Sequence, residues 1–120
     1  MRKLLGIAAA GEAATGVALL VYPSVVVRLL IGAEIEGAGV AMSRGFGISL
    51  IALGLACWPG RDAGSSATHA LRAMVSYGLL LTLYLAYLGA VRDSVGILLW
   101  PVVGVHAVLT ILLARAWLKA

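Results

Sequence analysis

Three ionisable residues stand inside stretches that are otherwise almost wholly apolar: Glu12, Arg44 and His106. An ionisable group inside a membrane helix is costly, so each of them is by default a candidate functional residue. A carboxylate or an imidazole can exchange a proton with a ligand, and a guanidinium can pair with an acidic group. Together they predict a small polar pocket inside a hydrophobic protein.

Tyrosine hydroxyls add to this polar set. Tyr77 and Tyr84 are seven residues apart, which puts them on one stripe of a helix. A tyrosine hydroxyl at membrane depth requires a hydrogen-bond partner. We expect Tyr84 to lie nearest the layer of Glu12, Arg44 and His106, so these four residues form the candidate ligand-binding site.

Each of these residues also has a purely structural interpretation. Glu12 and Arg44 can form a buried ion pair that fixes the register of two helices. His106 can be a core histidine that donates to a backbone carbonyl, and the tyrosines can be packing residues. The sequence contains no metal-ligand cluster, nucleophile elbow or phosphate-binding glycine loop. It gives no reason to predict an enzyme, no catalytic residue and no required cofactor.

The composition indicates the environment in which these residues lie. The chain has 120 residues, of which 62% are hydrophobic and 12% are charged. A typical soluble domain has about 45–50% apolar and about 25% charged residues. A soluble protein this short could not bury so many apolar side chains, whereas lipid removes the difficulty. The net charge is +4 without a basic run, so nucleic acid is not an expected partner.

Four apolar stretches, each of about 20 residues, lie between turn signals and can cross a hydrocarbon core of about 30 Å as helices. They cover residues 4–22, 38–58, 70–91 and 95–117. Residues 23–31 are also apolar but too short to cross, and Pro23 suits a first helical position. We therefore expect an all-α fold: one integral membrane four-helix bundle, residues 1–120, with a short interfacial helix between its first two membrane helices.

These spans place the three ionisable residues at similar depths. At 1.5 Å per residue, Glu12 is about 15 Å, Arg44 about 9 Å and His106 about 16 Å from the same side of the membrane. Small neighbours such as Gly16 and Gly47 favour faces that are buried against other helices. We expect Glu12, Arg44 and His106 to meet in one buried layer of a compact bundle.

The distribution of Lys and Arg predicts the orientation. Six basic residues fall on the side of the N-terminus and two on the other side, and the more basic side of a membrane protein faces the cytoplasm. The larger set is Arg2, Lys3, Arg61, Arg72, Arg115 and Lys119, and the smaller set is Arg28 and Arg92. We expect a multi-pass protein of the bacterial inner (plasma) membrane with both termini in the cytoplasm.

The chain resembles the DoxX-like proteins and related small four-helix membrane proteins of bacteria. The resemblance is carried by the pair Gly11-Glu12, the run Tyr22-Pro23-Ser24, and Arg44 followed by glycines. It implies a four-helix fold over most of the chain. The DoxX-like family includes a membrane subunit associated with thiosulfate–quinone oxidoreduction, but the resemblance assigns no catalytic residue to this sequence.

Three functions fit these observations. The first is a membrane module or accessory subunit that associates with a partner subunit, or with itself as a homo-oligomer, through Gly- and Ala-rich faces. The second is binding or transport of a small amphiphile or quinone in a polar pocket formed by Glu12, Arg44, Tyr84 and His106. The third is a redox-complex subunit in which the same residues surround a quinone headgroup.

Overall fold

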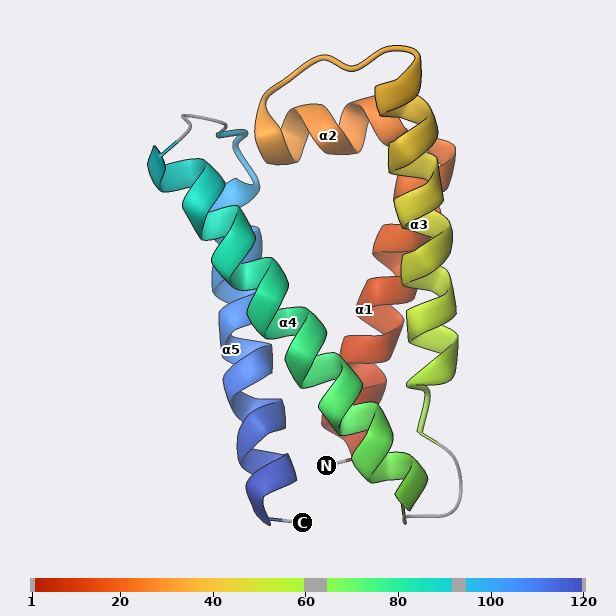
Figure 1. Cartoon of the computed structure of the whole chain (residues 1–120), viewed down its shortest axis with the longest axis vertical. Coiled ribbons are helices and arrows are strands. Elements are labelled where there is room, and N and C mark those ends of the chain that lie inside the picture. Colours follow the sequence, from red (N-terminus) through yellow and green to blue (C-terminus); the bar gives the residue numbers. More distant parts are fainter. Residues whose placement is uncertain (1, 60–64, 92–94, 120) are drawn as a thin grey trace.

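A computed structural model of the chain describes residues 2–59, 65–91 and 95–119 (Figure 1). The described residues form five α-helices and no strand. In chain order these are α1 (Arg2–Val21), α2 (Pro23–Ile31), α3 (Ala38–Ala56), α4 (Ser65–Val91) and α5 (Leu99–Lys119). The all-α class predicted from the sequence is confirmed.

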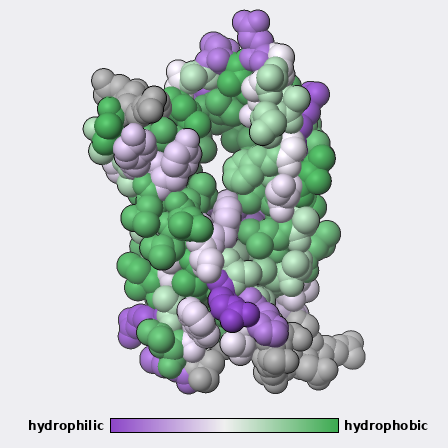
Figure 2. All heavy atoms as spheres, in the orientation of Figure 1, coloured by the Kyte–Doolittle hydropathy of each residue, from purple (hydrophilic) through white to green (hydrophobic). Residues whose placement is uncertain are grey.

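Four of these helices, α1, α3, α4 and α5, are long and apolar enough to cross a membrane. Hydrophobic side chains cover most of the visible sides of the molecule, and hydrophilic residues gather mainly towards its two ends (Figure 2). This is the surface of a multi-pass membrane protein, because the lipid-facing sides of such a protein need no polar cover. Both chain ends lie at one end of the molecule (Figure 1). The basic residues Arg61 and Arg92, which contribute to the predicted orientation, lie outside the described residues.

The four long helices form two antiparallel pairs, α1 with α3 and α4 with α5. The pairs meet at the end of the molecule that holds the termini and diverge toward the other end, where Figure 2 shows an opening between them. The molecule measures 43 × 27 × 17 Å along its principal axes. The predicted compact bundle is therefore better described as two tight pairs that enclose a cleft.

Small residues hold α1 against α3. A Cβ atom added to Gly54 would lie 2.7 Å from the carbonyl oxygen of Ala9. Further along the helices, a Cβ atom added to Gly16 or to Gly47 would lie equally close to the carbonyl oxygen of the other glycine. Helices in lipid associate through van der Waals packing, which improves as their backbones approach. The Gly- and Ala-rich sequence thus produces a tight α1–α3 pair.

Where the two pairs meet, the core is formed by apolar side chains from α1, α4 and α5 and from the end of α3. Its buried members are Leu5, Ala8, Ala9, Cys57, Leu71, Met74 and Leu113. The Cys57 thiol lies 3.8 Å from the Ala70 carbonyl oxygen. Cys57 is thus part of the packing between the helix pairs.

The short helix α2 lies across the end of the molecule, above the opening between the pairs (Figure 1). It starts at Pro23, as predicted, and ends at Ile31, directly before Gly32, which has the left-handed conformation with φ 79°. Its last carbonyl groups accept hydrogen bonds from the segment before α5: Gly96 N–H donates to Leu30 at 3.1 Å and Leu98 N–H to Leu29 at 2.8 Å. These bonds explain why α5 begins at Leu99 and not at residue 95.

Candidate functional site

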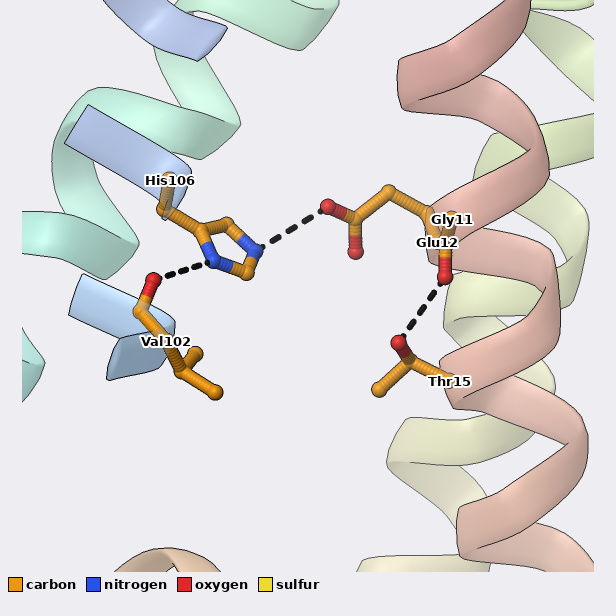
Figure 3. Close-up of polar contacts among 5 residues, drawn as sticks. All are labelled: Gly11, Glu12, Thr15, Val102 and His106. Atoms are coloured by element: carbon orange, nitrogen blue, oxygen red, sulfur yellow. Dashed lines mark hydrogen bonds and ion pairs between the residues drawn. The ribbon is translucent and has the colours of Figure 1, made fainter. Parts of the chain in front are cut away.

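Glu12 and His106 meet across the cleft between α1 and α5. The Nε2 atom of His106 lies 3.1 Å from Oε1 of Glu12 (Figure 3). Glu12 is 7% exposed, although it is a carboxyl group in an apolar helix. Among the described residues, this is the only hydrogen bond between α1 and α5. Glu12 and His106 therefore lie in one layer, as their predicted depths indicated.

The other ring nitrogen of His106 is held by its own helix. Nδ1 lies 2.9 Å from the carbonyl oxygen of Val102, one turn earlier (Figure 3). A carbonyl can only accept, so Nδ1 must carry a hydrogen and donate it. This bond fixes the orientation of the ring and leaves Nε2 to face Glu12.

A third polar side chain contacts this pair from α4, and it is Tyr77. The rings of Tyr77 and His106 pack edge to face, with centroids 6.5 Å apart and planes at 67°. Tyr84 was expected here, but its side chain is 57% exposed. The physical reason is the diagonal course of α4, which moves away from α1 toward its C-terminal end (Figure 1), so only one end of the tyrosine stripe reaches the layer.

Arg44 is also absent from the layer. Its side chain is exposed, and it makes no hydrogen bond or salt bridge within the described part of the chain. Gly47, Leu50 and Gly54 are the buried residues of α3. At about 100° per residue, Arg44 lies roughly 90° around the helix from the centre of their stripe. The predicted Glu12–Arg44 ion pair is therefore wrong, and His106 takes the place of the guanidinium.

The bridged pair forms part of the wall of a cavity of about 250 Å³ between α1 and α5. The cavity is lined by Ala8, Gly11, Glu12, Thr15, Pro101, Val102, Val105, His106 and Leu109. Most of these side chains are apolar. Thr15 contributes a hydroxyl, which donates to the Gly11 carbonyl at 2.8 Å (Figure 3). No Lys or Arg lines this cavity.

This arrangement combines the features of a small-molecule site: a concave, mostly apolar space with a few convergent polar groups. It offers a carboxyl–imidazole pair able to hold or release a proton. The described residues contain no group of three His, Cys, Asp or Glu side chains able to hold a metal ion. The hydrogen bond from His106 to a backbone carbonyl was one of the structural interpretations given by the sequence, and Val102 is the residue that accepts it. The choice of Tyr77 over Tyr84 could not be found by spacing alone.

Comparison with protein-family models, curated proteins and solved structures found no match to this chain. The fold and the site define a helical multi-pass membrane protein with a mostly apolar cavity between its helices, in whose wall Glu12 and His106 meet. The resemblance to the DoxX-like proteins stays a prediction.

Proposed function

We propose that the protein binds a small amphiphile in the cleft between α1 and α5, with the headgroup against Glu12 and His106. The observation that carries the proposal is the buried Glu12–His106 hydrogen bond in the wall of an otherwise mostly apolar cavity. A purely structural pair would need no cavity beside it. The opening between the helix pairs (Figure 2) would give a lipid-dissolved ligand lateral access.

The size of the cavity supports a compact headgroup. An apolar cavity of about 150 Å³ accepts benzene, so a cavity of about 250 Å³ has room for one substituted ring. An apolar tail would remain in the cleft or in the surrounding lipid. A quinone, the ligand considered from the sequence, meets this size limit. A strongly anionic headgroup does not suit the site, because Arg44 lies away from it and the cavity lining contains no other strong cation.

Extraction of the purified protein followed by mass spectrometry tests this proposal. We expect an amphiphile at a stoichiometric level in the native protein and a loss of at least tenfold in Glu12→Leu and His106→Leu. Ser49→Ala is the matched control, because Ser49 is exposed on α3 and donates only to the Gly45 carbonyl of its own helix. An empty native bundle in several detergents would overturn the proposal. Co-purification of an empty bundle with another subunit would favour the membrane-module function instead.

We also propose the bacterial inner membrane as the location, with both termini in the cytoplasm. The basic residues near the termini support it. Cysteine labelling tests it cleanly, since the native Cys57 is only 2% exposed. A membrane-impermeant maleimide should label Glu34→Cys in intact cells and Thr68→Cys only after the inner membrane is opened. The reverse pattern would invert the proposed orientation.

A further inference from the structure

The geometry of the Glu12–His106 bridge fixes the number of protons that it holds. Nδ1 of His106 already donates its hydrogen to the Val102 carbonyl. A hydrogen bond between Nε2 and Oε1 of Glu12 then requires one more proton, either on the carboxyl or on Nε2. In the first case both groups are neutral, and in the second they form an ion pair. In both cases the bridge carries one exchangeable proton and has a net charge of zero.

Removal of that proton leaves a net charge of −1 beside an apolar cavity. The charged groups of the elements around it do not compensate this charge. On α3, Arg44 is exposed and makes no contact with Glu12, and on α2, Arg28 pairs with Glu34 at 3.5 Å. On α4, Tyr77 packs against the His106 ring, while His69 and Arg72 are exposed in the N-terminal part of that helix, and Arg72 makes no salt bridge with a described residue.

An uncompensated carboxylate in such surroundings is costly. Two species can restore neutrality: the proton itself, or a cation that enters the cavity. Because Glu12 is the only acidic side chain in the cavity lining, one cation suffices. The proton and the cation therefore exclude each other.

We infer that the ligand of this site is a cationic amphiphile, an amine or quaternary ammonium with an apolar body, which binds in exchange for one proton. The inference rests on the proposed function and names the class of its ligand. In the exchange, the cation pairs with the Glu12 carboxylate, the hydrogen bond between Oε1 and Nε2 is lost, and the shared proton leaves to the solvent. His106 keeps its Nδ1 hydrogen on Val102, and the cavity is neutral before and after.

The cavity suits such a headgroup in size and lining. A benzyltrimethylammonium ion has one ring and one compact charged group. A cavity of about 150 Å³ accepts benzene, and this cavity, of about 250 Å³, leaves room for the charged group as well. The apolar side chains of Val102, Val105 and Leu109 offer contacts for methyl groups and a ring. A quaternary ammonium cannot donate a hydrogen bond, so its recognition depends on the carboxylate charge.

The test is a titration of the purified full chain in detergent with benzyltrimethylammonium, followed by calorimetry and by a pH indicator in weak buffer. We expect saturable binding, release of one proton per cation bound, and an affinity that rises about tenfold per pH unit across the range where the bridge is protonated. The neutral isostere neopentylbenzene, in which carbon replaces nitrogen, should release no proton. Its affinity should not vary with pH.

Two variants complete the design. Glu12→Gln keeps a hydrogen-bonding side chain of the same size but removes the charge, and it should lose cation binding and proton release at least tenfold. Glu34→Gln removes one acidic group far from the cavity, where the side chain is 73% exposed, and should bind as the native protein does. Circular dichroism and gel filtration establish that each variant is folded.

The outcomes separate the inference from the proposed function. If the neutral isostere binds and the cation does not, or if the cation binds without proton release, the inference is overturned while an amphiphile site remains. If neither probe binds the native protein and extraction finds it empty, both fail. The measurements on the native chain decide this even if Glu12→Gln does not fold.

Discussion

Gly16 of α1 and Gly47 of α3 face each other so closely that neither position has room for a Cβ atom. A Cβ on Gly16 would lie 2.5 Å from the Gly47 carbonyl oxygen, and one on Gly47 would lie 2.6 Å from the Gly16 carbonyl oxygen. Both contacts are to backbone, which cannot move aside as a side-chain tip can. The α1–α3 pair therefore depends on the absence of two side chains.

We predict that Gly16→Ala and Gly47→Ala each destabilise the protein by about 1–3 kcal/mol, the usual cost of overpacking. Unfolding in mixed detergent micelles, followed by circular dichroism, measures this. Gly45→Ala is the control on the same helix, because a Cβ there meets no atom within 4 Å. Because Ala favours a helix more than Gly does, Gly45→Ala should not destabilise the protein. If it were as damaging as Gly47→Ala, the close approach of the two backbones would not be the cause.

The Glu12–His106 bridge should appear as an energetic coupling. In a double-mutant cycle of Glu12→Leu and His106→Leu, we predict a coupling free energy of roughly 0.5–2 kcal/mol, the range of interhelical hydrogen bonds in membranes. The same cycle with Glu12→Leu and Arg44→Leu should be additive, since Arg44 is exposed and has no contact with Glu12. If only the cycle of Glu12→Leu and Arg44→Leu showed coupling, the result would support an ion pair between Glu12 and Arg44 in place of the Glu12–His106 hydrogen bond.

The sequence predicted the helices well for a simple physical reason. In lipid every backbone polar group must be bonded within the segment, so an apolar run of about 20 residues has few options other than a helix. Pro23 likewise fixes the start of α2, because its ring and missing N–H suit a first helical position. The depth of Glu12 and His106 followed from the rise per residue, and their contact confirms it.

The partners of these residues could not be predicted in the same way. Depth is a one-dimensional quantity, whereas contact also depends on the rotation of each helix and on its tilt. Arg44 has a suitable depth, but the Gly47–Leu50–Gly54 stripe turns it outward. Tyr77 and Tyr84 share a stripe, and the diagonal course of α4 decides between them (Figure 1).

The choice between the two tyrosines is testable by NMR of the His106 ring. The edge-to-face contact with Tyr77 places the imidazole in the shielding field of an aromatic ring, with centroids 6.5 Å apart. We predict that Tyr77→Leu shifts the ring resonances of ¹⁵N-labelled His106, and that Tyr84→Leu leaves them unchanged. A shift in Tyr84→Leu without one in Tyr77→Leu would contradict the packing of α4 on α5.

The last prediction concerns the contact between α2 and residues 95–98, the segment before α5. Gly32 has φ 79°, and a Cβ there would lie 2.7 Å from the Val95 carbonyl oxygen, whereas Gly37 has φ 51° and a Cβ there meets nothing within 4 Å. Both Gly→Ala changes place a Cβ atom on a residue with positive φ, where L side chains are strained, but only at Gly32 does that Cβ also meet the backbone of the segment before α5.

Hydrogen exchange distinguishes the two effects. The amides of Gly96 and Leu98 donate to α2 carbonyls, so they should be protected in the native protein. We predict that Gly32→Ala speeds their exchange by about tenfold or more, while Gly37→Ala leaves it near the native rate. Equal acceleration in both variants would mean that α2 is held by its own conformation and not by its contact with residues 95–98. Since α2 lies above the opening between the helix pairs (Figure 1), Gly32→Ala should also loosen the cover of the cleft that holds Glu12 and His106.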